Sequence, residues 1–258
     1  MNKAKVEHTS ASAPFTAYSR YYDLLYQDKD YPAEAAYIHD VLQRHGVKHG
    51  DLLEFGSGTG KHGRLLSLLG YRVHGIERSR EMVSQALQTE GFTCEAGDIC
   101  SVRLARTFDA VLSLFHVVSY QVTNAAATAV FARAAEHLEA GGLFVFDIWY
   151  SPAVYHSRPE VRVKRMANAS VEVLRIAEPI VYPNEDRVDV AYNVFVTDLV
   201  TKSVETVTEV HGMRHFSLPE LDLLGAMNGF ERIGAEAFLT GAAPSEETWG
   251  VCVVMRKI

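Results

Sequence analysis

The sequence predicts an α/β protein with a doubly wound, largely parallel sheet. An apolar run at residues 52–55 ends in a glycine-rich turn, and a helix with apolar periodicity follows it. Strand patterns then alternate with helix patterns as far as residue 149, which favours parallel pairing. Residues 161–216 differ, because they form long extended stretches rich in β-branched residues. We therefore expect a Rossmann-like seven-stranded sheet with an antiparallel β insertion before the last helix.

The composition is typical of a soluble globular protein and argues against several other classes. The 258 residues are 48% hydrophobic, and no apolar run approaches the ~20 residues of a membrane helix. The net charge of -7 argues against a chain-wide nucleic-acid footprint. Cys94, Cys100 and Cys252 form no C-x-x-C pair, so we expect no zinc site and no disulfide framework. Residues 1–14 lack the apolar core of a signal peptide, so we expect a reduced, cytoplasmic setting without membrane contact.

The first fifty residues are predicted to be a flexible tail, residues 1–14, and a helical lid, residues 15–50. Tyr18, Tyr22 and Tyr26 recur at intervals of four, which places them on one face of a helix. Two interpretations of these rings stay open. They cover a cleft as a lid, or they only pack this segment onto the domain.

The predicted core comprises residues 51–159 and 217–258, and the predicted insertion comprises residues 160–216. Core strands are expected at residues 52–55, 71–77, 92–96, 108–114, 143–149, 230–238 and 249–255. Expected helix N-caps are Ser79, Asn124 and Ser217. The insertion contains extended stretches on both sides of a turn at residues 183–186, and we expect it to form a substrate face or a dimer face.

A glycine loop, residues 56–60, lies between the first strand and its helix, where backbone N–H groups and the helix dipole favour a polar ligand. The P-loop pattern fails at both of its ends. Gly58, Gly60 and Gly63 match the dinucleotide pattern G-x-G-x-x-G, which is a weak signal alone. Glu54 discriminates between a dinucleotide and a sulfonium cofactor. Its charge would repel the pyrophosphate of a dinucleotide and would suit a cationic sulfonium cofactor with an ammonium group.

Residues 52–149 resemble the core of the class I S-adenosylmethionine-dependent methyltransferases. The acid-x-G-x-G-x-G loop, the acid ending the second strand, the Gly-Asp pair after the third strand and the apolar fourth strand occur in that family's order. Further segments are similar to sugar N-methyltransferases that dimethylate 3-amino nucleotide sugars: Tyr22-Asp23-Leu24-Leu25-Tyr26, Ser113-Leu114-Phe115 and Trp149-Tyr150-Ser151-Pro152. That group also carries an antiparallel insertion. Asp147 is a difference, since a Glu is usual there.

The resemblance implies S-adenosyl-L-methionine as cofactor, S-adenosyl-L-homocysteine as product, and a set of cofactor-binding residues. Glu54 is expected to receive the ammonium group. Glu77 is expected to bind both ribose hydroxyls, because one carboxylate accepts two hydrogen bonds. The other expected cofactor-binding residues are Tyr22, Gly56, Ser57, Gly58, Arg78, Met82, Asp98, Ile99 and Leu114. No metal is expected.

The implied reaction is methyl transfer to an amino or hydroxyl group of a small molecule, with a nucleotide-linked sugar as the leading candidate. An amine must first lose its proton, and His116 follows the fourth strand at the sheet edge that faces ligands in this fold. His116 is the expected base, although it would equally serve only to shape the pocket. Tyr26 is expected to stabilise the reacting cation with its ring. The expected substrate-binding residues are Tyr26, Tyr120, Trp149, Tyr150 and Arg214.

Several alternatives stay open. His211, Arg214 and His215 are expected either to meet a phosphate or to form a solvated charged face. The acceptor is expected to be a small molecule and not a nucleic acid, and a homodimer is an open possibility. Competing functions are methylation of another small amine or alcohol, an NAD-dependent dehydrogenase, and a non-catalytic scaffold with the cofactor fold.

Overall fold

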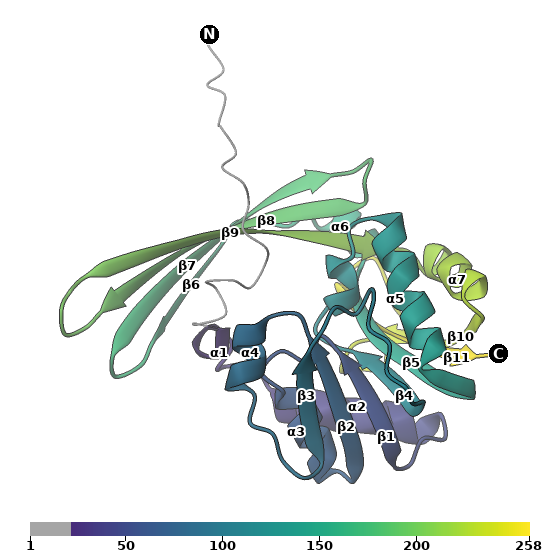
Figure 1. Ribbon diagram of the computed structural model, residues 1–258. Coiled ribbons are helices and arrows are strands. Elements are labelled where there is room, and N and C mark those ends of the chain that lie inside the picture. The colour runs from purple at the N-terminus through teal and green to yellow at the C-terminus, as the bar shows by residue number, and fades with distance from the viewer. Residues whose placement is uncertain (1–21) are drawn as a thin grey trace.

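One mixed sheet of eleven strands runs through residues 22–258, the part of the chain that this computed structural model describes (Figure 1). The main path of the sheet has the order β3-β2-β1-β4-β5-β9-β8-β7-β6, and β11 joins β10 to β5 on a branch. The Rossmann-like α/β class is therefore confirmed. The predicted tail and Tyr18 lie outside the described residues.

The core part of the sheet has parallel pairs and one antiparallel hairpin. The parallel strands are β1 (Gly50–Phe55), β2 (Tyr71–Glu77), β3 (Phe92–Ala96), β4 (Phe108–Ser113) and β5 (Leu138–Tyr150). The hairpin consists of β10 (Phe230–Ala237) and β11 (Gly250–Lys257), and β11 pairs antiparallel with β5. Because the parallel strands share one direction, the carboxyl ends of β1, β2 and β4 meet at one edge, which is where this fold binds ligands.

Helices bury apolar residues against both faces of this sheet (Figure 1). On one face, α2 (Tyr31–Arg44) and α3 (Lys61–Leu68) pack in a cluster that includes Ile38, Leu42 and Leu66. On the other face, α5 (Asn124–Glu136) and α7 (Leu218–Met227) pack in a cluster built around aromatic residues of β5. Such two-sided burial explains why the core strands are continuous apolar runs.

Side-chain caps start the helices close to the predicted positions. Ser79 Oγ accepts from Met82 N at the start of α4 (Arg80–Gln85), and Ser217 Oγ accepts from Glu220 N at the start of α7. The prediction that Asn124 caps α5 is wrong. Thr123 has extended backbone angles and its Oγ1 accepts from Ala126 N, so Asn124 is the first helical residue.

Four long antiparallel strands lie between α6 (Ser151–His156) and α7, and Figure 1 shows them projecting away from the core. They are β6 (Arg162–Ala167), β7 (Val171–Tyr182), β8 (Arg187–Asp198) and β9 (Val204–Phe216). The end of β9 pairs in parallel with Trp149 and Tyr150 of β5, so these strands continue the core sheet. We call this segment, residues 160–216, the insertion.

The N-terminal segment contacts both parts of the molecule. Leu25, at the end of α1 (Tyr22–Leu25), is buried against Val173 and Val194 of the insertion. Lys164 Nζ on β6 also donates to Leu25 O at 2.6 Å. The chain then crosses to the core, where α2 packs. The segment predicted to be a lid therefore bridges the insertion and the core.

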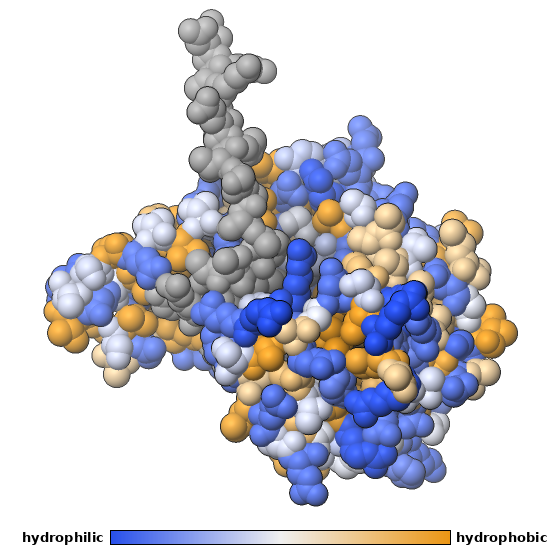
Figure 2. Space-filling view, viewed as in Figure 1, coloured by the Kyte–Doolittle hydropathy of each residue, from blue (hydrophilic) through white to orange (hydrophobic). Residues whose placement is uncertain are grey.

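The surface of the insertion carries exposed apolar residues, among them Val161, Val163 and Val204. Figure 2 shows such hydrophobic residues on the projecting strands, mixed with hydrophilic ones. Within residues 22–258, no helix has the length and apolar character needed to cross a membrane.

Candidate active site

A cavity of about 1090 Å³ lies between the ligand-binding edge of the core and one face of the insertion. The core contributes the glycine loop and the residues that follow β2, β3 and β4. The insertion contributes residues of all four of its strands, β6, β7, β8 and β9. The predicted site residues that line it are Tyr22, Tyr26, Gly56, Ser57, Gly58, Glu77, Arg78, Met82, Asp98, Ile99, Leu114, His116, Tyr120 and Trp149.

The glycine loop combines tight packing with an open approach from the cavity. Gly56 has φ +72°, and a Cβ there would lie 2.6 Å from the side chain of Val117. Gly58 has φ +56°, but outside the adjoining residues the nearest atom to a Cβ placed there would be Met82 Sδ, 3.9 Å away. Both residues need the left-handed conformation that glycine adopts without strain. Gly58 is therefore the position where a ligand can approach the backbone directly.

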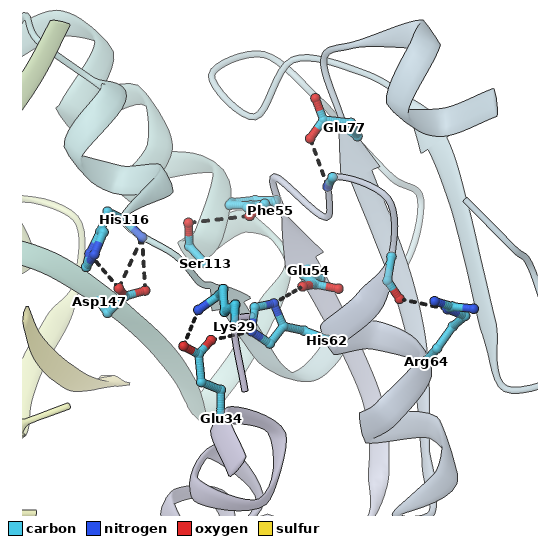
Figure 3. Close-up of polar contacts among 12 residues, drawn as sticks. Lys29, Glu34, Glu54, Phe55, His62, Arg64, Glu77, Ser113, His116 and Asp147 are labelled. Carbon is cyan, nitrogen blue, oxygen red and sulfur yellow. Dashed lines mark hydrogen bonds and ion pairs between the residues drawn. The ribbon is translucent and has the colours of Figure 1, made fainter. Parts of the chain in front are cut away.

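Glu77 ties the glycine loop to the next loop of the site. Its Oε2 accepts from Gly58 N at 3.0 Å (Figure 3), and its Oε1 accepts from Ser79 N at 2.7 Å. Burial raises the pKa of this carboxyl group, and the backbone donors, Ser79 foremost, oppose that rise. Each carboxylate oxygen has more than one acceptor position, so Glu77 retains capacity for ligand hydroxyls.

A buried series of ionisable side chains lies beneath the glycine loop (Figure 3). Lys29 pairs with Glu34, and Glu34 Oε2 lies 2.7 Å from His62 Nε2. His62 Nδ1 lies 4.0 Å from Glu54 Oε1. The series thus links the N-terminal segment to the acid at the end of β1.

Glu54 itself is 1% exposed and lies below the loop, so it does not line the cavity, whereas His62 does. Burial, followed by repulsion from Glu77, raises the pKa of Glu54 to about 8. Its Oε2 is buried without a hydrogen-bond partner among the described residues. A carboxyl group in this state would be stabilised by a nearby cation.

The two loops after β2 and β3 place the remaining predicted cofactor residues on the same cavity wall. Arg78 and Met82 line it beside Glu77, and Ile99 lines it beside Asp98. The Asp98 Oδ1 accepts from Cys100 N at 2.9 Å, which holds this loop in a compact turn.

His116 and Asp147 form a close pair at the end of β4. His116 Nδ1 lies 2.7 Å from Asp147 Oδ2, and His116 N also donates to that oxygen at 3.1 Å (Figure 3). Burial by itself would raise the pKa of Asp147, but attraction to His116 and its hydrogen bonds outweigh burial and hold the pKa below its usual value. With Nδ1 directed at Asp147, Nε2 is the ring nitrogen left for a ligand.

The backbone around His116 is strained. Phe115 and His116 have φ +63° and +62°, a region that costs non-glycine residues about 1–3 kcal/mol each. Asp147 stabilises this conformation because it accepts from the backbone and faces the ring of His116. A strained pair of residues held by a buried carboxylate at a cavity is typical of a functional site.

Aromatic rings surround this part of the cavity. The Tyr26 ring lies 4.7 Å from the Tyr22 ring and 5.2 Å from the Phe115 ring. Trp149 lies 6.3 Å from the His116 ring and 5.9 Å from Trp249. Such rings exclude water and offer π faces to a cation.

Two residues predicted to bind substrate lie elsewhere. Tyr150 packs at the edge of the apolar cluster between the sheet and α5, outside the residues that line the cavity. Arg214 donates to Glu220 Oε1 at 2.6 Å and stacks on the Phe216 ring. The solvated face predicted for His211 and His215 is wrong, because they are 1% and 0% exposed.

Sequence reasoning also missed residues of the site. Asp147 was noted only as a sequence difference; it holds His116 from behind the cavity wall, and an acid near the end of an apolar strand is itself a signal. Arg162 and Arg175 line the cavity from β6 and β7, and Arg175 Nη1 donates to Tyr26 Oη at 3.5 Å. Nothing in the local sequence shows which face of a long strand will turn toward the site.

Comparison with known proteins agrees with this geometry. Residues 52–142 match the family model described as a methyltransferase domain. This part of the chain therefore matches a methyltransferase domain, as the sequence predicted. The match contains the glycine loop, Glu77 and Asp98, so it favours a methyltransferase over the dehydrogenase alternative.

Two of the curated relatives are amino-sugar N,N-dimethyltransferases. One is the dTDP-3-amino-3,4,6-trideoxy-alpha-D-glucopyranose N,N-dimethyltransferase of Streptomyces venezuelae, 36% identical over 137 residues, or 52% of this chain and 58% of that protein. The crystal structure of DesVI from Streptomyces venezuelae has a TM-score of 0.78 at 26% identity, with 93% of this chain and 98% of that chain covered.

A third relative is CalS10, an amino pentose methyltransferase from Micromonospora echinaspora solved with S-adenosylmethionine. Its TM-score is 0.74 at 25% identity, with 96% of this chain and 100% of that chain covered. In sequence, the match spans only about three fifths of the length of the curated relatives, 58% and 60% for the first two.

Proposed function

We propose that this protein transfers a methyl group from S-adenosyl-L-methionine to the amino group of a nucleotide-linked amino sugar. The observation that carries the proposal is one cavity shared by two sets of groups. The glycine loop with Glu77 lies on one side, and the His116–Asp147 pair with an arginine- and aromatic-lined insertion face lies on the other. The printed names of the relatives support the same class of acceptor.

The residues present fit the cofactor. Gly58 lines the cavity at a position where the backbone can be approached closely, and Glu77 retains acceptor capacity for two ribose hydroxyls. The buried, unpartnered Oε2 of Glu54 fits an ammonium group that reaches it through water or through His62. Asp98 and Ile99 would meet the adenine ring, with Arg78 and Met82 beside it. Bound there, the cofactor supplies an electrophilic methyl group on a sulfonium.

His116 is the proposed base. A sugar ammonium group would titrate near ~10, by analogy with lysine, and must lose its proton before it can attack. Asp147 holds Nδ1 of His116, which leaves Nε2 to accept that proton. The strained backbone at Phe115 and His116 places this ring on the cavity wall. Tyr26 and Trp149 would surround the resulting cationic nitrogen with ring faces.

The acceptor is proposed to bind on the insertion. Arg162 and Arg175 are the cations that β6 and β7 bring to the cavity, and guanidinium groups match phosphate geometry well. They replace Arg214 in the proposal, since that residue is paired with Glu220. We assign residues 15–50 as the lid, residues 51–159 and 217–258 as the seven-stranded cofactor core, and residues 160–216 as the antiparallel acceptor-binding insertion.

A homodimer forms part of the proposal, with the insertion as its interface. β6 is an edge strand of the sheet, and Val161 and Val163 are exposed along it. Analytical ultracentrifugation at micromolar concentration tests this point separately from the activity.

The function is tested in two steps with the full chain. Calorimetric titration with S-adenosyl-L-homocysteine and, separately, with NAD should show binding of the first alone. Incubation with S-adenosyl-L-methionine and dTDP-3-amino-3,4,6-trideoxy-α-D-glucopyranose should then add one or two methyl groups to the sugar nitrogen by mass spectrometry. Binding of NAD alone would overturn the cofactor assignment, and cofactor binding without methylation of the sugar would overturn the acceptor assignment.

A further inference from the structure

A buried histidine–glutamate pair on β9 reaches the cavity through Tyr120. His211 Nε2 lies 3.0 Å from Glu209 Oε2, and His211 Nδ1 lies 3.2 Å from Tyr120 Oη. Glu209 and His211 are only 3% and 1% exposed. Burying a carboxylate and an imidazole is costly unless they are paired, and neither group has a role in the cofactor site or at His116.

Strand register places this pair on the same face of the insertion as two cavity-lining residues of β8. Glu209 and His211 are two residues apart on β9, so their side chains share one face. Their partners on β8 are Tyr192 and Val190, which both line the cavity, whereas Glu209 and His211 do not line it themselves. The Tyr192 ring also packs edge-on against the His211 ring at 4.8 Å.

Tyr120 connects His211 to the core side of the cavity. It lies at the end of η2 (Val117–Tyr120), the short helix that follows His116, and it lines the cavity. The series of contacts from Tyr120 through His211 to Glu209 therefore crosses from the core to the insertion. Tyr120 and His211 lie 91 residues apart in the sequence.

The pairing and the protonation state of His211 together determine the polarity of the Tyr120 hydroxyl. A carboxylate only accepts hydrogen bonds, so in a neutral imidazole Glu209 selects the tautomer that carries its proton on Nε2. We take His211 as neutral: Nδ1 is then an acceptor, and Tyr120 donates its O–H to it. The Tyr120 oxygen then presents lone pairs, and it can accept a hydrogen bond from a group in the cavity.

We propose that Glu209, His211 and Tyr120 form a relay that orients the acceptor sugar, with the Tyr120 oxygen accepting a hydrogen bond from a hydroxyl or amino group of that sugar. Tyr120 is the residue that contacts substrate, whereas His211 and Glu209 are positioning residues that act through it. The choice of a sugar as ligand rests on the proposed function, but the polarity of the relay does not.

The polarity is tested without activity. ¹⁵N NMR of the full chain with labelled histidine, assigned by loss of one signal in His211→Gln, should show His211 with a protonated Nε2 and a non-protonated Nδ1. The Glu209→Gln variant should shift these signals toward a mixture of tautomers, because an amide can donate as well as accept. A protonated Nδ1 in the wild-type protein would overturn the proposal.

The acceptor role is tested by kinetics with dTDP-3-amino-3,4,6-trideoxy-α-D-glucopyranose as the probe. Tyr120→Phe removes one hydrogen bond and should raise KM for the sugar about fivefold. The Kd for S-adenosyl-L-homocysteine should stay within about twofold of the wild-type value. The matched control is Tyr155→Phe, because the Tyr155 hydroxyl donates to Asp186 and Pro183 outside the cavity. It should leave KM unchanged.

The outcomes distinguish failure of the relay from failure of the proposed function. The relay would be overturned if KM for the sugar is unchanged in Tyr120→Phe, or if the affinity for S-adenosyl-L-homocysteine falls as much as the affinity for the sugar. The methyltransferase proposal would stand in both cases. No methylation of the probe by the wild-type protein would overturn the proposed acceptor, and the NMR result would still decide the polarity of the relay.

Discussion

The glycine-loop side of the cavity and the insertion side differ in what they present to a ligand. The first side relies on backbone groups and strand-end acids, as at Gly58 and Glu77. Each of these is fixed by a few consecutive residues. The second side relies on side chains of long strands, such as Arg175 and Tyr192, whose positions depend on pairing with distant strands.

This difference suggests that the two sides of the cavity bind different kinds of ligand. Local backbone geometry recognises a constant ligand, since the same loop can hold the same cofactor in any enzyme of the class. Side chains on an insertion can be exchanged without disturbing that loop, so they suit a variable acceptor. His116 lies at the junction, because its backbone follows β4 and its ring faces Asp147 on β5. The predictions below test the two sides and the junction.

The largest effect is expected on the cofactor side, at Glu77. Glu77→Ala removes the acceptor of Gly58 N and Ser79 N together with the proposed ribose contacts. Binding of S-adenosyl-L-homocysteine should weaken about 100-fold, because hydrogen bonds to a charged group are the strong ones. Calorimetry measures the change. Glu95→Ala, an exposed acid at the end of the neighbouring strand β3, is the control, and an equal loss in both variants would remove Glu77 from the site.

The junction should respond in turnover and not in cofactor affinity. His116→Ala and Asp147→Asn should each lower kcat about 30-fold, within the usual range for a general base, while the Kd for S-adenosyl-L-homocysteine changes little. Asp147→Asn acts because it removes the charge that orients the ring. A kcat that stays at the wild-type value across the pH range in His116→Ala would show that His116 is not the base.

The acid beneath the loop should affect stability in a pH-dependent way. The folded-state pKa of Glu54 is raised to about 8 from 4.5, so between these values the native state keeps a proton that the unfolded state has lost. Stability of the ligand-free protein should therefore fall as pH rises from 4.5 through 8. Glu54→Gln should remove this loss and be more stable than wild type by about 5 kcal/mol at pH 9, the free energy of a shift from 4.5 to about 8.

Urea unfolding of the ligand-free protein at pH 5, 7 and 9 measures the Glu54 effect. The wild-type and variant values should converge at the lowest pH. If both proteins show the same dependence on pH, Glu54 does not hold a proton in the native state.

The smallest effect is expected on the insertion side, where one cation is removed from a solvated phosphate contact. Arg175→Gln should raise KM for the dTDP sugar about fivefold, and the difference should shrink at high salt because partly exposed charges are screened. Arg165→Gln is the matched control. Arg165 pairs with Leu174, one residue from Arg175, so it points to the opposite face of the sheet. A similar effect of both substitutions would show that the cavity face is not the acceptor site.

Much of the cofactor side was predictable from the sequence, and for a physical reason. The strand, the glycine loop and the helix are consecutive, and an acid at the end of the next parallel strand must lie at the same edge. The positions of Gly58, Glu77 and Asp98 followed from that reasoning, and the structure places all three on one wall. Their roles as ligand contacts stay predictions. Glu54 was expected at the ligand, but its strand buries it one layer below.

The insertion side was much less predictable. The strands of the insertion were expected close to where they lie, but Arg214 was chosen for the substrate while Arg162 and Arg175 line the cavity. A shift of one residue in register moves every side chain to the other face, and no local pattern reports it in strands with charges on both faces. His211 is a second example. A histidine among charged residues was expected at the surface, but it is buried and contacts Tyr120, which lies far away in the sequence.

The sequence by itself determined the order of strands and helices, the glycine loop and the likeness of residues 52–142 to a methyltransferase domain. These depend on periodicity, chain direction and spacings of a few residues, which a linear chain displays. Only the tertiary structure decided that His116 faces Asp147, and that Tyr120 faces His211. Those pairs lie 31 and 91 residues apart, so the first exists only once β4 and β5 have paired, and the second only once β9 has been added beside β5.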